Sequence, residues 1–384
     1  MSVTAAQGFL AAGIAAGIKE NGNPDLALVV NSGPRLAAAG VFTSNRVKAA
    51  PVVWSEQVLK GGRVSAVILN SGGANACTGP LGFQDTHATA EKVAEALDGH
   101  SAAEVAVAST GLIGVRLPMD KLLPGVEKAA AELTGHGGEK AAIAIKTTDS
   151  VHKTAQVSKD GWTVGGMAKG AGMLAPGLAT MLAVLTTDAD APADQLDAAL
   201  RAATRTTFDR VDSDGCTSTN DTVLLLASGA SGVVPDQDAF VEAVREVCGD
   251  LARQLIGDAE GASKDIRIDV VNAATEDDAV EVGRSIARNN LLKCAIHGED
   301  PNWGRVLSAI GTTSATFDPD RLNVAINDVW VCKNGSVGED RELVDMRYRE
   351  VRITADLAAG TQSAVIWSND LTADYVHENS AYSS

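Results

Sequence analysis

The chain has 384 residues, enough for two or three domains or one large one, and its formal net charge is −17 at pH 7. So acidic a protein repels phosphate backbones and anionic lipid surfaces, which disfavours nucleic-acid and membrane binding. Hydrophobic residues make up 45% of the sequence, as in ordinary globular proteins, and no apolar run approaches the ~18 residues of a membrane-spanning helix.

Alternating short apolar runs and helical patterns predict a mixed fold. In chain order, the predicted elements are strands at 26–30 and 64–69, a helix at 86–97, a strand at 105–108, a helix at 122–133, a strand at 181–185, a helix at 193–204, a strand at 223–227, a helix from 240 to 255, and strands at 266–271, 322–326 and 364–367. Loops are predicted at 135–139, 188–194 and 334–342. Because helices and strands do not alternate strictly, we expect an α/β mixed (α+β) layered protein with at least one antiparallel sheet.

Cysteine usage indicates a reducing compartment. The five cysteines are scattered, odd in number and without a CxxC pair, which is typical of unpaired thiols in the cytoplasm. The first positive side chain, Lys19, follows an alanine-rich start, whereas a signal peptide carries its charge ahead of the apolar segment. We therefore expect a cytoplasmic protein without a secretory leader.

Familiar catalytic and metal motifs are absent or incomplete. The sequence contains no HExxH, GxxxxGK[ST] or GxSxG, which argues against zincin, P-loop and α/β-hydrolase sites. The segment from Asp212 to Gly215 is similar to a calcium loop, but its glycine comes two positions too early and Val223 replaces the final glutamate. The histidines show no ligand spacing, and His297 lies in a polar turn where a structural role is expected. No metal site is predicted.

Two small-residue loops follow predicted strands. Residues 70–79 read Asn-Ser-Gly-Gly-Ala-Asn-Ala-Cys-Thr-Gly, which either lets backbone amides approach a ligand or simply turns tightly. In Ser109-Thr110-Gly111, Thr110 and Gly111 either present hydrogen-bond donors to a developing oxyanion or form an ordinary strand-to-loop turn. The residues alone leave both alternatives open.

Residues 169–188 are the most informative segment. A Gly/Pro-rich loop ends at Ala179, and Thr180 opens an apolar strand. Thr180 is either a β-branched residue that begins a strand or the nucleophile of a self-cleaving precursor, whose hydroxyl attacks the Ala179 carbonyl. Cleavage would release an α-amino group with a reference pKa of about 7.7–8.0, which could act as the base for the hydroxyl.

At this segment the sequence resembles the ornithine acetyltransferase family, also called the glutamate N-acetyltransferase family. The matching motifs span nearly the whole chain: 8–9, 40–45, 70–75, 109–111, 146–149, 169–188, 257–264, 297–305 and 379–384. The Ala-Thr-Met-Leu block in its Lys-Gly-x-Gly-Met setting is the most specific of them. Ala171, Gly177 and Leu178 depart from the residues that the family often carries in this loop.

The resemblance implies an arginine-biosynthesis enzyme. Family members move acetyl from N2-acetylornithine to glutamate, and some also accept acetyl-CoA. For this chain we hypothesise a ping-pong route through an acetyl-threonine intermediate, without a cofactor. The precursor cleaves itself, here into an α chain of residues 1–179 and a β chain of residues 180–384, and the expected assembly is a heterotetramer of two of each. The implied fold is a sheet sandwich flanked by helices, similar to N-terminal nucleophile hydrolases but with distinct connectivity.

Carried over position by position, the resemblance also implies a set of site residues. The nucleophile is Thr180, cleaved from Ala179; the oxyanion hole is Thr110 and Gly111; the substrate-binding residues are Thr147, Lys169, Thr180, Glu260, Asn379 and Ser384. We assign Lys169 to a substrate carboxylate and Glu260 to the ornithine ammonium because their charges are complementary. Taken singly, either residue is more simply explained as a solvated loop charge.

Two other classes of protein remain as alternatives. The first is an N-terminal nucleophile amidohydrolase or aminopeptidase, whose acyl-enzyme would react with water instead of an amine. The second is a non-enzymatic amino-acid-binding protein, which needs no chain break. The reaction products distinguish the two enzymes, and an intact chain would indicate the binding protein.

Overall fold

The computed structural model describes residues 2–175 and 181–381. The chain divides into two compact units: residues 1–209 with 216–255, and residues 210–215 with 256–383. The predicted division into chains 1–179 and 180–384 concerns a covalent break within the first of these ranges. That division stays a prediction.

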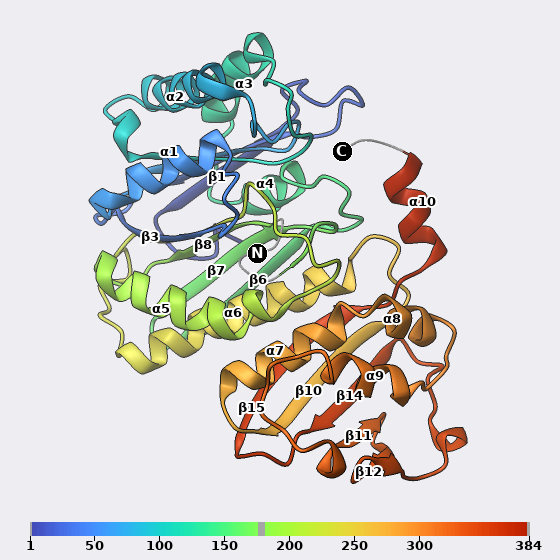
Figure 1. The fold of residues 1–384 in the computed structure, drawn as a ribbon. Helices are drawn as coiled ribbons and strands as arrows, with labels where there is room; N and C mark the ends of the chain where they lie inside the picture. Colours follow the sequence, from blue (N-terminus) through green and yellow to red (C-terminus); the bar gives the residue numbers. More distant parts are fainter. Residues whose placement is uncertain (1, 176–180, 382–384) are drawn as a thin grey trace. The chain divides into compact units, whose positions relative to one another are not determined.

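Two sheets form the described part of the first unit (Figure 1). One has four strands in the order β1-β2-β4-β5, and the other has five in the order β3-β9-β8-β7-β6. Their bounds are β1 Phe9–Ile14, β2 Leu26–Asn31, β3 Ala37–Phe42, β4 Ala66–Asn70, β5 Val105–Ser109, β6 Lys153–Lys159, β7 Trp162–Lys169, β8 Leu182–Thr187 and β9 Thr222–Ala227. The β4–β5 and β8–β9 pairs are parallel, and the other neighbours are antiparallel.

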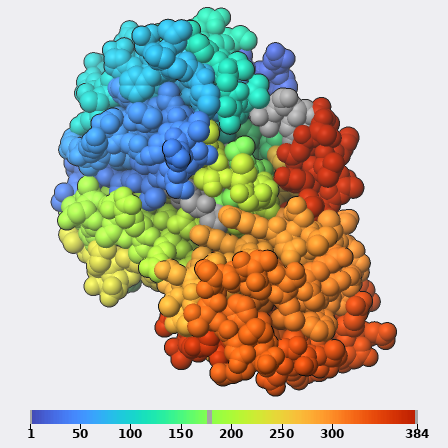
Figure 2. All heavy atoms as spheres, viewed as in Figure 1, coloured from blue at the N-terminus to red at the C-terminus, as the bar shows by residue number. Residues whose placement is uncertain are grey.

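Helices pack against these sheets. They are α1 Ala50–Val58, α2 Gly79–Ala96, α3 Met119–Ala131, α4 Gly138–Ala144, α5 Ala193–Thr206 and α6 Gln237–Gly257. Side chains of α2 and α3 share a core with the four-stranded sheet, and in Figure 2 the atoms of α1 and α2 form a continuous blue-to-cyan surface. The α6 residue Phe240 packs on Trp162 of β7, with ring centroids 5.6 Å apart.

The core of the first unit lies between its two sheets. Val67 and Leu69 of β4 belong to the same buried cluster as Val184 of β8 and Leu224 of β9. At the edge of the four-stranded sheet, the Ser55 hydroxyl of α1 donates to the Val107 carbonyl at 2.7 Å and accepts the Val107 N–H at 2.9 Å. Unpaired polar groups of an edge strand are thereby satisfied.

The second unit is built on a mixed sheet with the order β13-β12-β11-β14-β10-β15. Its elements are β10 Asp265–Ala273, β11 Asn323–Ile326, β12 Val329–Lys333, β13 Ser336–Val337, β14 Glu350–Asp356, β15 Gln362–Asn369, α7 Glu276–Ala287, α8 Asn290–His297, α9 Trp303–Ile310 and α10 Ala373–Ala381. Ile268 and Ile366 of the sheet share a core with Ile286 of α7 and Val306 of α9. Across the described residues, the helices are too short or too polar to cross a bilayer.

These sheets and flanking helices confirm the mixed α/β fold class. Each predicted strand and helix is present, with shifted bounds. The helix predicted at 86–97 begins earlier, at Gly79, where Pro80 in the first turn lacks only an N–H that the helix does not use. The loop prediction at 135–139 is wrong at its end, because α4 begins at Gly138. Residues 334–342, predicted as a loop, include the two-residue strand β13 and a 3₁₀ turn at Arg341–Leu343.

Candidate active site

The turn after β5 lies against the loop after β4. Because these strands are parallel, both end at the same edge of their sheet. The Thr110 N–H donates to the Asn70 carbonyl at 2.9 Å, and the Gly73 N–H donates to the Thr110 carbonyl at 3.0 Å. The Ser109 hydroxyl donates to the Asn70 side-chain oxygen at 2.5 Å. These bonds hold the two loops rigidly together.

Gly111 is required by this close approach. Its φ of +130° is one that L side chains rarely adopt, and a Cβ there would lie 2.8 Å from the Gly73 nitrogen. Because the Thr110 amide is already bonded, the groups left to bind a developing oxyanion are the Thr110 hydroxyl and the Gly111 amide. Of the donors that the predicted oxyanion hole could use, the Thr110 hydroxyl and the Gly111 amide are therefore the two candidates.

The Lys169 side chain links the five-stranded sheet to the turn after β5. It is the last residue of β7, and its side chain is only 2% exposed. Its Nζ donates to Thr110 Oγ1 at 3.3 Å, although the two residues are 59 positions apart in sequence. Within the sheet, Lys169 pairs with Leu182 at the start of β8. Two predicted site residues therefore meet where the chain enters β8, directly after the predicted break.

Asn220 and Asp221, just before β9, were missed by the sequence patterns. The Asn220 amide donates to the carbonyls of Ala74 at 2.6 Å and Ser109 at 2.8 Å, which ties both loops to this segment. Asp221 Oδ1 accepts the Met181 N–H at 3.1 Å, and burial raises the pKa of this carboxyl well above its usual range. The available sequence signal was a polar run, 217–221, directly before an apolar strand.

Thr147 is connected to the same group through its backbone. Its N–H donates to Asp149 Oδ2 at 3.0 Å, and the same oxygen lies 4.0 Å from Lys169 Nζ. Asp149 was not singled out by any sequence motif beyond its place in the 146–149 match. Thr147, Lys169 and Thr110 thus belong to one connected polar cluster.

Glu260 and Asn379 form a second group, in the second unit. Glu260 is 8% exposed, and its Oε2 accepts a hydrogen bond from the Asn379 side-chain amide at 2.9 Å, which ties the loop after α6 to α10. The pKa of nearby Glu378 is raised, first by burial and then by repulsion from the Glu260 and Asp374 carboxylates. These surroundings favour a cation.

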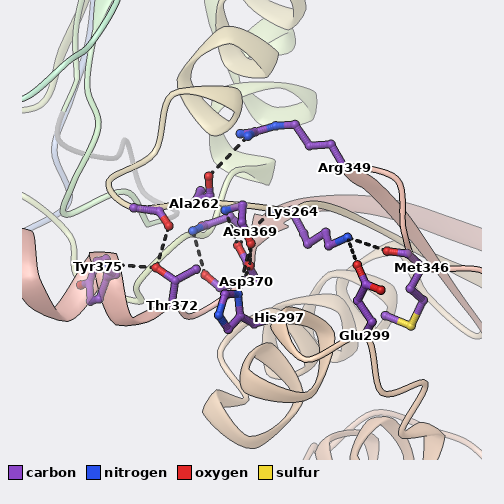
Figure 3. A network of polar contacts seen from close by, with 12 residues as sticks. Ala262, Lys264, His297, Glu299, Met346, Arg349, Asn369, Asp370, Thr372 and Tyr375 are labelled. Atoms are coloured by element: carbon purple, nitrogen blue, oxygen red, sulfur yellow. Dashed lines mark hydrogen bonds and ion pairs between the residues drawn. The ribbon is translucent and has the colours of Figure 1, made fainter.

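A polar network anchors the Glu260 loop (Figure 3). Asp370 Oδ1 accepts the N–H groups of Ser263 at 2.9 Å and Lys264 at 3.0 Å. His297 Nδ1 lies 3.1 Å from both the Ser263 hydroxyl and Asp370 Oδ2. Because the serine and the aspartate meet the same ring nitrogen, the histidine does not relay protons between them. Its contacts are those of the structural residue that the sequence predicts.

Thr372 joins the same loop to the start of α10. Its hydroxyl donates to the Gly261 carbonyl at 2.6 Å and accepts the Tyr375 N–H at 3.0 Å, as a residue that caps a helix does (Figure 3). Hydrogen bonds therefore hold both the loop that carries Glu260 and the start of the helix that carries Asn379.

The predicted site residues fall into three sets. Thr110, Gly111, Thr147 and Lys169 are connected in the first unit, Glu260 and Asn379 are bonded in the second, and Ala179, Thr180 and Ser384 lie outside the described residues. Within residues 2–175 and 181–381, no three His, Cys, Asp or Glu side chains are grouped as metal ligands would be.

Replacing Asn220 with alanine should destabilise the first unit. Two buried carbonyls would lose their donor, and we expect a loss of about 2 kcal/mol in the free energy of unfolding. Urea unfolding of the variant and the parent measures this loss. The matched control is Asn45→Ala at a half-buried position. It removes the bond of 2.8 Å that the Asn45 amide donates to the Thr217 carbonyl and the bond of 2.9 Å that its side-chain oxygen accepts from the Val47 N–H, and it should cost less because neither bond is fully buried. An equal loss in the free energy of unfolding for both variants would show that the two bonds of Asn220 contribute no more to stability than those of Asn45.

Comparison with known proteins identifies the family. The chain matches the ArgJ family over residues 10–384. It is 85% identical over 384 residues, the full length of both chains, to the arginine biosynthesis bifunctional protein ArgJ of Streptomyces avermitilis. It is 59% identical to the protein of the same name from Mycobacterium tuberculosis, over 100% of this chain and 96% of that one.

A solved structure is also similar in sequence. Ornithine acetyltransferase from Mycobacterium tuberculosis, complexed with ornithine, has a chain that is 63% identical over 47% of this chain and 96% of its own, with a TM-score of 0.46. On the match over residues 10–384 and the identity with full-length relatives, this chain belongs to the ArgJ family.

Proposed function

We propose that this chain is a glutamate N-acetyltransferase of arginine biosynthesis, which moves acetyl from N2-acetylornithine to glutamate and releases ornithine and N-acetylglutamate. The observation that carries the proposal is the meeting of Lys169 and Thr110 opposite the start of β8, in a chain of the ArgJ family. This arrangement suits acyl transfer, because it places the buried Lys169 ammonium and the two oxyanion donors of Thr110 and Gly111 beside β8, the strand that follows Thr180 in the sequence.

The chemistry we propose is a ping-pong reaction. The Thr180 hydroxyl attacks the acetamide carbonyl of acetylornithine, and its α-amino group takes the hydroxyl proton and returns it to the departing ornithine amine. The Thr110 hydroxyl and the Gly111 amide bind the oxyanion, which would form beside them. The acetyl-Thr180 ester then reacts with the amine of glutamate, which restores the enzyme. No cofactor takes part in these steps.

We propose the same hydroxyl for self-cleavage. Attack of Thr180 on the Ala179 carbonyl forms an ester as the peptide bond breaks, and water then releases the Ala179 carboxylate and restores the hydroxyl. The resulting α and β chains would assemble as a heterotetramer of two of each. The Met181 N–H held by Asp221 and the Lys169–Leu182 pairing support this proposal, because they fix the backbone directly after the break.

Two further assignments complete the proposal. Acetyl-CoA would serve as a second acetyl donor to glutamate, and the description of the relatives as bifunctional supports this. The protein would work in the cytoplasm, since all five of its cysteines are free thiols.

Substrate recognition requires charges of both signs. Lys169 would bind the α-carboxylate that acetylornithine and glutamate share, and Glu260 would bind the side-chain ammonium of ornithine. Burial and then repulsion from Glu260 and Asp374 raise the pKa of Glu378, and this group of carboxylates supports a role for Glu260 with a cation.

Glu260→Gln should weaken acetylornithine binding. The variant keeps an oxygen for Asn379 but removes the charge, and the loss of one charged hydrogen bond should raise the KM by about tenfold. N-acetylnorvaline, which lacks the ammonium, should show little change. Glu378→Gln is the matched control, because it removes a charge from the same acidic group without touching a predicted site residue. An equal KM increase for both substrates would remove the ammonium role from Glu260.

The proposed function is tested by the products formed from acetylornithine with and without glutamate. N-acetylglutamate that appears only when glutamate is added supports the transferase. Free acetate at the same rate without glutamate would indicate the amidohydrolase alternative, and an uncleaved chain with neither product would indicate an amino-acid-binding protein. A parallel assay with acetyl-CoA tests the second donor.

A further inference from the structure

A buried aspartate joins the two segments of the second unit that carry Glu260 and Asn379. Asp370 directly follows β15, and its side chain is not exposed to solvent. Its Oδ1 accepts the N–H groups of Ser263 at 2.9 Å and Lys264 at 3.0 Å (Figure 3), and its Oδ2 accepts the Ser263 hydroxyl. One carboxylate therefore bonds the end of the loop that contains Glu260 to the segment that leads into the helix of Asn379.

These bonds continue the pairing of β10 with β15 beyond the ends of the two strands. The paired residues at this end are Asp265 of β10 and Asn369 of β15. One step further along, the Asp370 N–H donates to the Lys264 carbonyl at 3.3 Å. From there the Asp370 and Thr372 side chains supply the bonds, because the backbone then turns into α10. The loop after α6 is thus held as an extension of the sheet.

The same loop approaches the start of α10 closely. Gly261 has a φ of +62°, which L side chains rarely adopt, and a Cβ there would collide with the Tyr375 backbone. The Thr372 hydroxyl donates to the Gly261 carbonyl at 2.6 Å. Glu260 directly precedes this contact, so a displacement of the loop against α10 would alter the 2.9 Å bond between Glu260 and Asn379.

We propose that Asp370 is a positioning residue, which holds the Glu260 carboxylate where it meets the ammonium of ornithine. A carboxylate that is already held in place binds a cation more tightly, because binding need not supply the entropy cost of ordering it. Asp370 would supply that order through its bonds to Ser263 and Lys264, without touching the substrate. This inference rests on the proposed function, because it takes Glu260 as the ammonium-binding group.

The neighbouring charged side chains have other roles. Lys264 Nζ donates to the Tyr348 carbonyl at 3.0 Å and to Glu299 Oε1 at 2.9 Å, so this lysine anchors its segment to the chain ahead of β14. His297 Nδ1 lies 3.1 Å from Asp370 Oδ2, but the histidine side chain is 45% exposed. Among these groups, Asp370 is the one that ties the loop to the segment ahead of α10.

Asp370→Ala tests this role through a KM that depends on the ammonium. The variant removes the acceptor of the Ser263 and Lys264 N–H groups, so the Glu260 loop should lose its fixed geometry. We expect the KM for acetylornithine to rise by about tenfold, as it would if the charged contact of Glu260 were lost. The KM for N-acetylnorvaline and the kcat should change little, because neither depends on the ammonium contact. Steady-state kinetics with both donors measure these constants.

A double variant shows whether Asp370 acts through Glu260. If it does, Asp370→Ala/Glu260→Gln should raise the acetylornithine KM no further than Glu260→Gln alone, by about tenfold. Independent effects would instead multiply to about 100-fold, because the free-energy changes of unconnected sites add. A multiplied effect overturns the positioning role. Equal KM increases for acetylornithine and N-acetylnorvaline in Asp370→Ala overturn it as well.

Two conservative variants separate geometry from charge. Asp370→Asn loses the charge but keeps an oxygen that can accept both N–H groups, so its KM for acetylornithine should stay close to that of the parent. Asp370→Glu keeps the charge but moves the carboxylate by one methylene, so its KM should rise; it also replaces Asp370→Ala in these tests if that variant fails to fold. The opposite order, with asparagine impaired and glutamate normal, overturns the positioning role.

A matched control separates this effect from a general loosening of the second unit. Asp269 of β10 is also buried, and its carboxylate accepts hydrogen bonds from Arg267 Nε at 3.0 Å and Arg352 Nε at 2.6 Å. Asp269→Ala should lower the thermal stability and leave the acetylornithine KM unchanged. If it raises this KM as much as Asp370→Ala does, the positioning role is overturned. Absence of acetyl transfer in the parent would instead overturn the proposed function.

Discussion

Thr180→Ala is expected to give a single chain of 384 residues that transfers no acetyl group. The substitution removes both the group that attacks the Ala179 carbonyl and the group that carries acetyl. Loss of a covalent nucleophile typically lowers kcat by about 10⁶-fold, which places the variant at background. A denaturing gel and intact mass measure the cleavage, and N-acetylglutamate formation from acetylornithine measures the transfer.

Two companion variants make this result specific. Thr180→Ser keeps a hydroxyl and should still cleave and transfer, at altered rates. Thr163→Ala removes a threonine hydroxyl from β7 that contacts Ser158 Oγ at 3.0 Å near solvent, and it should cleave normally. Two chains of normal mass from Thr180→Ala would show that another group breaks the chain. Normal transfer by an uncleaved Thr180→Ala protein would remove the nucleophile assignment entirely.

Five of the strands that the sequence predicts are buried on both faces. Every residue of β2, β4, β5, β8 and β9 is buried, so these strands appear as continuous apolar runs. In contrast, β1, β3 and β7 read FLAAGI, AAAGVF and WTVGGMAK. Alanine and glycine carry little hydropathy contrast and low strand propensity, and the pairing with neighbouring strands decides their conformation.

The site residues also divide into those that the sequence identified and those that it missed. Thr110, Lys169 and Glu260 were identified because they match family motifs, since their residue types alone favour ordinary loop roles. Asp149 and Asn220 could not be found by local patterns. The Asn220 amide bonds to carbonyls 111 and 146 positions away, and Asp149 contacts Gly170, which is 21 positions away. A residue whose role is to hold other residues is defined by its partners, and these become visible only in the folded chain.

Gly111→Ala should lower kcat by about 10²–10³-fold, the usual cost of losing one oxyanion donor. The new Cβ would lie 2.8 Å from the Gly73 nitrogen and 3.0 Å from its Cα. Both are backbone atoms that hydrogen bonds hold in place, so the turn itself must move. That movement would displace the Gly111 amide and the Thr110 hydroxyl together. The KM for acetylornithine should change little, because Lys169 and Glu260 do not depend on Gly111 for their charge.

Gly114→Ala is the control that separates catalysis from backbone strain. Gly114 also has a positive φ, +87°, but a Cβ there meets nothing within 4 Å. Alanine at either position should cost about 1–3 kcal/mol of stability from the unfavourable φ, which thermal unfolding measures. Only Gly111→Ala should also lower kcat, with rates normalised to the amount of cleaved β chain. If both variants lose kcat equally, the loss reflects strain in the 111–114 loop, and the oxyanion is stabilised elsewhere. If neither does, the turn after β5 takes no part in the reaction.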